Sequence, residues 1–269
     1  MENKKKTLAI LNTLSVILVL FVNFASQKFN FNNTTIAEIS NRYDNLFTPA
    51  AYAFSIWGLI FLNLIIYSFY QIKRSFLSTK KSDFILQTGS WFLLSNLLNA
   101  CWVIVFSYNL IGLSVVIMLG ILFSLVQIII RTQMERWNAP IGIIACVWWP
   151  ICLYAGWISV ATIANIATYL VKIQWHGWGI TPTGWTLIMI AIVAILNLYL
   201  LISRNMREFV LVAVWALVAI FVKHQTTNPA IAYTAITIAV LLLIATATHG
   251  YQNKETNPFV KFKEWKKAS

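Results

Sequence analysis

Aromatic side chains gather where a polar stretch of this chain runs into an apolar one. Residues 43–58 include Pro49 and lead into a segment that carries Trp57, and two further tryptophans, Trp102 and Trp157, fall well inside later apolar segments. Tryptophan at the end of a membrane span is an interfacial anchor, but this chain has more rings than anchoring requires. Because indole faces stack on flat, hydrophobic molecules, the pattern predicts a site for such a ligand, with plain ring packing as the alternative.

Four asparagines also lie inside apolar segments: Asn63, Asn96, Asn99 and Asn165. A buried amide without a partner is costly, so we expect these side chains to form hydrogen bonds across helices. For each asparagine taken singly we prefer this structural role to ligand contact.

Ionisable chemistry is confined to the ends of the apolar segments. All eight acidic residues fall in loops, tails or at segment ends, which disfavours a proton-driven pump. No lysine lies in the middle of a segment, and no two histidines are spaced four apart, so neither a retinal Schiff base nor a metal site is predicted. No known catalytic motif is present. The three cysteines, Cys101, Cys146 and Cys152, are expected to be buried hydrophobic residues without disulfides.

The composition predicts an all-α integral membrane protein. Of the 269 residues, 59% are hydrophobic and only 10% are charged, where a soluble protein has about a quarter. The first segment is longer than the apolar core of a signal peptide, so we interpret it as an uncleaved first span. We predict eight spans of about 20 residues: 7–26, 48–71, 88–108, 110–130, 145–171, 184–203, 208–223 and 229–250.

The charge of +12 is explained by membrane topology and does not indicate nucleic-acid binding. With eight spans and both termini inside, 16 of the 20 lysines and arginines lie on the cytoplasmic side. A bacterial inner (cytoplasmic) membrane fits this bias. Seven spans would place the C-terminal lysines outside.

Three connecting regions carry information. Residues 27–48 are polar and Asn-rich, and they either fold over the mouth of a helix bundle or form a flexible connector. Residues 174–185 hold three tryptophans with Gly and Pro, which is typical of an interfacial turn. The basic tail, 252–269, either lies on an anionic leaflet or is disordered. We therefore divide the chain into 1–173 (five helices), 174–251 (three helices) and 252–269 (cytoplasmic tail).

Three sequence blocks resemble the TspO/MBR family of tryptophan-rich sensory proteins, also called translocator proteins. The blocks are Tyr43, Leu46, Pro49 and Trp57; then Asn99, Trp102 and Phe106; and then Trp157 to Asn165 with an Ala-Thr pair between them. They occur in the family's order and cover roughly residues 7–172. The longer chain is similar to a bacterial branch with extra C-terminal helices.

The resemblance implies a five-helix bundle that binds porphyrins under its first loop. The ligand-binding residues predicted from the blocks are Tyr43, Pro49, Trp57, Asn99, Trp102, Phe106, Trp157 and Asn165, and Tyr52 and Phe54 of the stretch 43–58 are predicted with them. Some family members degrade protoporphyrin in light with two tryptophans, which correspond here to Trp57 and Trp157. Arg42 replaces the tryptophan of the family's first loop, and Pro49 alone remains of its prolines.

The sequence therefore predicts a membrane-embedded binder or sensor of tetrapyrroles or similar hydrophobic molecules. Transport of such a molecule and light-dependent porphyrin degradation stay as alternatives, and a scaffold without a ligand is the fourth hypothesis. No cofactor is required, and sterol is a weaker ligand hypothesis than porphyrin. The resemblance also implies a homodimer, although no small-residue face in the sequence specifies one.

Overall fold

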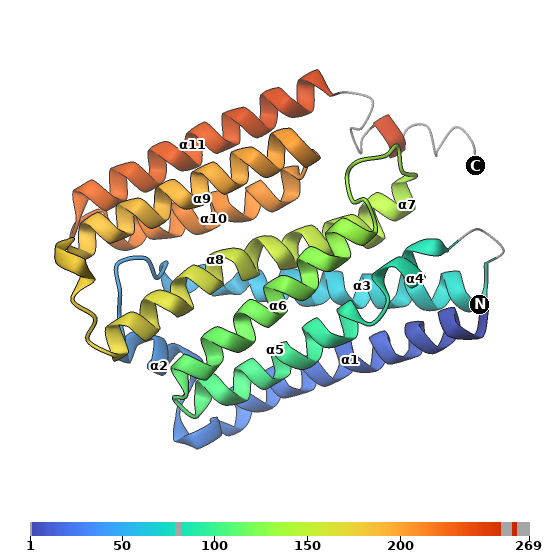
Figure 1. The fold of residues 1–269 in the computed structure, drawn as a ribbon, viewed down its shortest axis with the longest axis horizontal. Coiled ribbons are helices and arrows are strands. Elements are labelled where there is room, and N and C mark those ends of the chain that lie inside the picture. The colour runs from blue at the N-terminus through green and yellow to red at the C-terminus, as the bar shows by residue number, and fades with distance from the viewer. Residues whose placement is uncertain (1, 79–81, 254–259, 263–269) are drawn as a thin grey trace. The chain divides into compact units, whose positions relative to one another are not determined.

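The computed structural model describes residues 2–78, 82–253 and 260–262, and every element in them is helical (Figure 1). Lys80, Lys81 and most of the predicted tail lie outside the described residues. The α-helices are α1 (Glu2–Phe29), α2 (Ile36–Arg42), α3 (Ile56–Phe76), α4 (Asp83–Thr88), α5 (Trp91–Ser107), α6 (Ile111–Arg131), α7 (Ile141–Ile143), α8 (Trp149–Lys172), α9 (Pro182–Arg204), α10 (Arg207–His224) and α11 (Pro229–Gln252).

Six helical stretches of the described chain are long and apolar enough to cross a membrane, so this is an integral, multi-pass all-α protein. They are Glu2–Phe29, Ala51–Phe76, Ile111–Arg131, Ile141–Lys172, Pro182–Arg204 and Pro229–Gln252. Each matches one of the eight spans predicted from the sequence.

The other two predicted spans correspond to shorter or more charged helices. The span predicted at 88–108 begins later, because Gly89 adopts φ +56° and separates α4 from α5. The 17 residues of α5 extend about 25 Å, less than the hydrocarbon core of a bilayer. The span predicted at 208–223 corresponds to α10, whose 18 residues include Arg207, Glu208 and Lys223. Eight crossings therefore stay a prediction.

Two compact units interleave along the chain. The first unit contains Met1–Asn45, Trp57–Thr132 and Ala161–Trp175, and the second contains Leu46–Ile56, Gln133–Val160 and His176–Ser269. Helix α8 contributes its first half to the second unit and its second half to the first. These units differ from a division of the chain at residue 173, because the second unit contains segments from both sides of that residue.

In the first unit, α1 and α6 flank α5, and polar side chains connect the helices (Figure 1). Asn96 of α5 donates to Ser15 of α1 (3.0 Å), and Asn12 of α1 donates to Gln71 of α3 (2.9 Å). The expectation that buried amides bond across helices is thus confirmed for Asn96. It is wrong for Asn63, whose amide donates to the Leu59 carbonyl of its own helix (2.9 Å).

The polar region 27–48 contains an ordered helix. Thr35 and Glu38 form a capping box at the start of α2, in which each side chain accepts from the other residue's backbone N–H. Ile39 of α2 is fully buried against Phe106 and Ile111. Of the two hypotheses for this region, the structure favours a folded element over a flexible connector.

In the second unit, α10 packs against both α9 and α11 (Figure 1). A π-helical stretch, η3 (Ile144–Trp148), joins α7 to α8 immediately before Pro150. Proline lacks an N–H and cannot make the regular helical bond, which accounts for irregular backbone next to Pro150.

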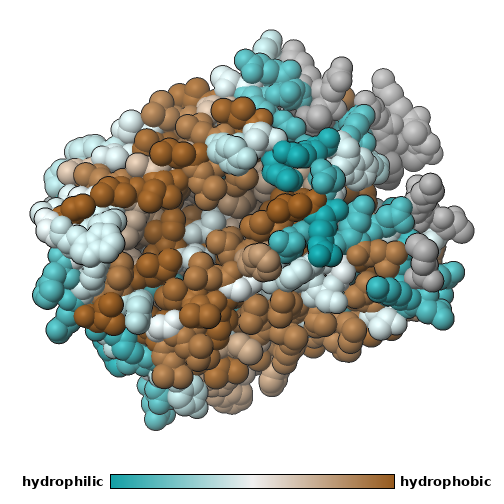
Figure 2. All heavy atoms as spheres, viewed as in Figure 1, coloured by the Kyte–Doolittle hydropathy of each residue, from teal (hydrophilic) through white to brown (hydrophobic). Residues whose placement is uncertain are grey.

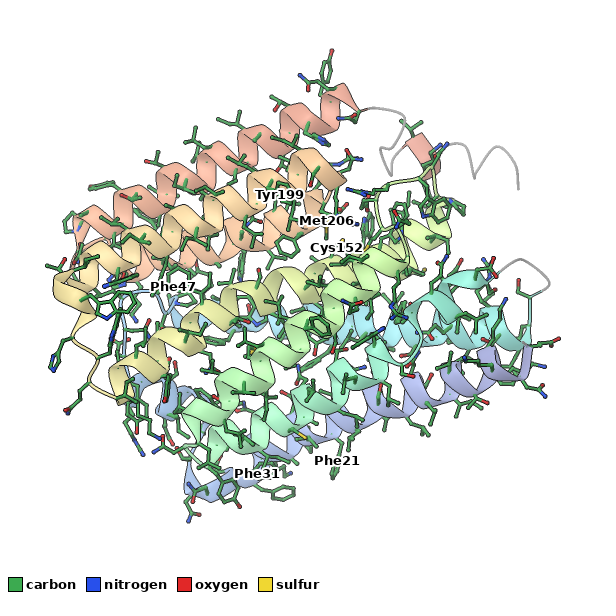
Figure 3. All side chains as sticks on the ribbon, in the orientation of Figure 1. Phe21, Phe31, Phe47, Cys152, Tyr199 and Met206 are labelled. Carbon is green, nitrogen blue, oxygen red and sulfur yellow. The ribbon has the colours of Figure 1, made fainter. Side chains whose placement is uncertain are left out.

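Large apolar side chains remain exposed on the outer faces of helices. Phe21 of α1 and Tyr199 of α9 are 64% and 65% exposed, and Phe21 points away from its bundle in Figure 3. Figure 2 shows hydrophobic surface over α1 and α5 in the first unit and over α9 and α11 in the second. Exposed apolar faces of this extent are what contact with lipid requires.

We predict that Gly156→Ala destabilises the protein. A Cβ at Gly156 of α8 would lie 3.1 Å from both the Phe209 carbonyl oxygen and the Val212 Cβ of α10, and this helix contact has little room to give. Overpacking of this kind costs about 1–3 kcal/mol. Thermal unfolding in detergent should show a lower Tm. The matched control is Gly58→Ala in α3, where a Cβ meets nothing within 4 Å; an equal loss in both variants would contradict the close-packing argument.

Candidate ligand site

The residues predicted to bind a ligand divide between the two units. Tyr43, Trp57, Asn99, Trp102, Phe106 and Asn165 belong to the first unit, whereas Pro49, Tyr52, Phe54 and Trp157 belong to the second. The two groups differ in how far their polar atoms are already satisfied.

Trp102 and Asn165 satisfy each other in the first unit. The Trp102 Nε1–H donates to Asn165 Oδ1 (2.8 Å), and Asn165 Nδ2 donates to Ser114 Oγ of α6 (3.0 Å). The Trp102 ring also stacks on Phe106, with centroids 4.9 Å apart. This arrangement uses the polar atoms of α5 and α8 to join them with α6, which is the structural role expected for a buried amide.

The other first-unit residues are engaged in similar packing. Tyr43 packs against the buried cluster of Ile39, Phe106 and Ile111, and the Lys172 ammonium lies 5.7 Å from the centre of its ring. Trp57 stacks on Phe61 one turn along α3 (5.2 Å). Asn99 accepts a long hydrogen bond from Asn23 of α1 (3.4 Å).

Trp157 is different, because its indole N–H is buried without an acceptor. The side chain is 2% exposed, and among the described residues nothing accepts from its Nε1. The edge of its ring meets Phe54, with centroids 5.8 Å apart and planes at 84°, and Phe54 is 38% exposed. A buried donor left unpaired costs about 1–3 kcal/mol, so the unpaired N–H of Trp157 destabilises the folded protein.

Phe54 belongs to the approach segment, the name used here for Leu46–Ile56, which leads into α3. Its second half forms a short 3₁₀ helix, η2 (Ala51–Ser55), and Pro49 is buried. The ring of Tyr52 meets Trp215 of α10 edge to face, with centroids 5.3 Å apart. The sequence analysis did not identify Trp215, because no motif connects α10 with a segment 160 residues earlier.

Two carboxyl groups in the second unit were also overlooked. Glu135, in the loop before α7, is only 7% exposed, and Glu208 accepts from Trp149 Nε1 (2.9 Å). Burial and the nearby negative charge of Glu208 raise the pKa of Glu135 to about 8, while Arg207 lowers it less. The sequence analysis placed both residues in loops or at segment ends and gave them no role.

The cysteine expectation holds for one residue and fails for another. Cys152 is buried and donates to the sulfur of Met134 (3.7 Å); Figure 3 labels it together with Met206, also of the second unit. Cys101 of α5 is exposed. All three thiols are free.

Comparison with known protein families identifies the chain. The family model described as TSPO-like protein matches residues 9–248, so this protein belongs to the TSPO-like family. The match confirms the resemblance drawn from the three sequence blocks. It also extends through most of α11, whereas those blocks reached only to about residue 172. Searches of curated proteins and of solved structures each found no match.

We predict a pH-dependent stability that originates at Glu135. Because its pKa is higher in the folded state than the ordinary value of 4.5, folding favours the protonated form. This contribution is complete below about pH 4.5 and is lost as the pH rises through about 8, at about 1.4 kcal/mol for each unit of pKa difference. Glu135→Gln should therefore match the wild-type Tm at pH 5 and exceed it by several degrees at pH 9.

Glu38→Gln provides the matched control. Hydrogen bonds from the Thr35 backbone and the Thr34 hydroxyl lower the pKa of Glu38, so this carboxylate is ionised throughout pH 5–9. Its substitution should shift the Tm by a constant amount. A constant Tm difference for Glu135→Gln as well would refute a buried, protonated Glu135.

Proposed function

We propose that this TSPO-like membrane protein binds a flat, hydrophobic molecule of the tetrapyrrole class beside Trp157. The observation that carries the proposal is the unpaired indole N–H of a fully buried tryptophan, next to an aromatic ring that is partly exposed. A ligand with an acceptor atom would satisfy the N–H, and its flat face would cover the exposed ring of Phe54.

The chemistry of a tetrapyrrole suits both requirements. Its macrocycle is planar and apolar, and its carboxylate side chains and ring nitrogens supply acceptors. A purely aliphatic ligand would bury surface but would leave the Trp157 N–H unpaired. The ligand is therefore expected to be aromatic and to carry at least one acceptor.

We further propose that the protein lies in a bacterial cytoplasmic membrane with both termini inside. The support is the distribution of lysine and arginine along the sequence, which favours this orientation over the reverse. Transport and photochemical degradation stay predictions, since no described contact favours either over binding alone.

Titration of the purified protein with protoporphyrin in the dark should give saturable quenching of tryptophan fluorescence. Trp157→Phe keeps a ring but removes the donor, so it should weaken binding about five- to tenfold. The Tm without ligand should change little, because the lost packing is offset by removal of a buried, unpaired N–H. This pairing of weaker binding with unchanged stability is the signature of a donor reserved for a ligand.

Trp178→Phe is the matched control, since Trp178 is 82% exposed and belongs to the same unit. It should leave the dissociation constant unchanged. Absence of saturable quenching with the wild-type protein would refute the proposal. Equal affinities for the wild type and Trp157→Phe would show that the ligand does not bind beside Trp157.

A further inference from the structure

The approach segment is held by the main chain as well as by rings. The Ala50 N–H donates to the Ala219 carbonyl of α10 (3.2 Å), and Trp215 Nε1 of the same helix donates to the Ala53 carbonyl (3.0 Å). Trp215 and Ala219 are one helical turn apart and so lie on one face of α10. The ring of Tyr52 also contacts Trp215, so this face of α10 contacts the segment at Ala50, Tyr52 and Ala53.

His224 adds a fourth contact at the end of α10. It is 3% exposed, and its Nε2 lies 2.9 Å from the Leu46 carbonyl while its Nδ1 lies 3.3 Å from the Thr227 hydroxyl. A carbonyl only accepts, so Nε2 carries a proton and donates. The buried imidazole thus satisfies the carbonyl of the first residue of the approach segment.

These contacts reach the residues that present the proposed ligand site. Phe54, whose ring contacts Trp157, comes directly after Ala53, and Tyr52 comes directly before Ala53. The approach segment satisfies only some of its backbone groups itself, through the 3₁₀ bonds of η2, so its conformation also depends on partners outside it. Helix α10 supplies such partners to Leu46, Ala50 and Ala53.

We infer that α10 is a clamp that fixes the approach segment, with Trp215 and His224 as positioning residues for Phe54. The inference gives the C-terminal helices a role in ligand affinity although α10 itself need not touch the ligand. The affinity part rests on the proposed function. The clamp itself does not, because it is defined by contacts within the second unit alone.

Two readouts test the inference on the full-length protein. Hydrogen exchange of residues 46–56, followed by mass spectrometry, reports on the clamp, and quenching by protoporphyrin reports on affinity. Trp215→Phe keeps a ring against Tyr52 but removes the donor to Ala53. It should speed exchange in this segment and weaken protoporphyrin binding about fivefold. Trp178→Phe should change neither.

His224 is tested by a pair of variants. His224→Ala removes the donor to Leu46, and we expect faster exchange at residues 46–56 and weaker binding. The amide of His224→Gln reaches a similar position with an N–H, so this variant should restore most of the protection and affinity. A loss of packing alone would not be rescued by a glutamine.

The outcomes separate the two proposals. If the wild type shows no saturable quenching, the proposed function fails, and exchange still decides the clamp. If exchange at 46–56 is unchanged in both Trp215→Phe and His224→Ala, the clamp is overturned. If exchange speeds up while protoporphyrin affinity stays the same, the role of α10 in positioning the ligand site is overturned. Faster exchange together with weaker binding, rescued in His224→Gln, supports the inference in full.

Discussion

The structure depends on one constraint: polar groups in apolar helices must find their partners inside the protein. In lipid there is no water to complete a hydrogen bond, and an unpaired amide or carbonyl is expensive. The first unit meets this constraint with side chains that join helices, fully where Asn165 bonds Ser114 and Trp102, and in part where Asn96 donates to Ser15 while its own Oδ1 has no partner among the described residues. The second unit meets it for the approach segment through α10.

The same constraint makes an exception informative. The Trp157 N–H is buried and unpaired among the described residues, a cost that a phenylalanine at this position would not have. Trp102, which the sequence blocks present as an equivalent candidate, is fully satisfied by Asn165. Two tryptophans that look alike in sequence thus differ in the one property that bears on ligand binding, the availability of a donor.

The sequence predicted features that depend on local residues better than features that depend on contacts between distant segments. Hydropathy locates long spans such as Ile111–Arg131 because each segment signals its own burial in lipid. It misjudges α5, because the backbone break at Gly89 depends on a local φ angle and leaves the average hydropathy of the region unchanged. It also misses α2, whose seven residues are too few to show a clear period, although the Thr35–Glu38 capping box was readable.

The candidate site was predictable as a set of residue types but not as an arrangement. Trp157 could be selected from a family block and Phe54 from the aromatic stretch 43–58, yet nothing in the sequence indicates which indole lacks an acceptor. Glu135 was assigned to a loop, and its burial near the start of α10 depends on tertiary contacts that the sequence does not show. Trp215 and His224 carried no motif at all, because their partners are backbone carbonyls, and a carbonyl leaves no trace in a sequence.

The carbonyl partners of Trp215 and His224 show how a helix near the C-terminus supports a segment that lies far earlier in the chain. A segment such as Leu46–Ile56, which precedes a span without regular helical bonds, needs a neighbour that offers a donor to Leu46 and Ala53 and an acceptor to Ala50. The carbonyl of the buried Ala219 accepts from the Ala50 N–H, and an indole or imidazole can donate without disturbing its own helix. The family model matches through residue 248 and so includes α10. Within the second unit, α10 thus supplies hydrogen-bond partners that the approach segment needs in addition to its own 3₁₀ bonds.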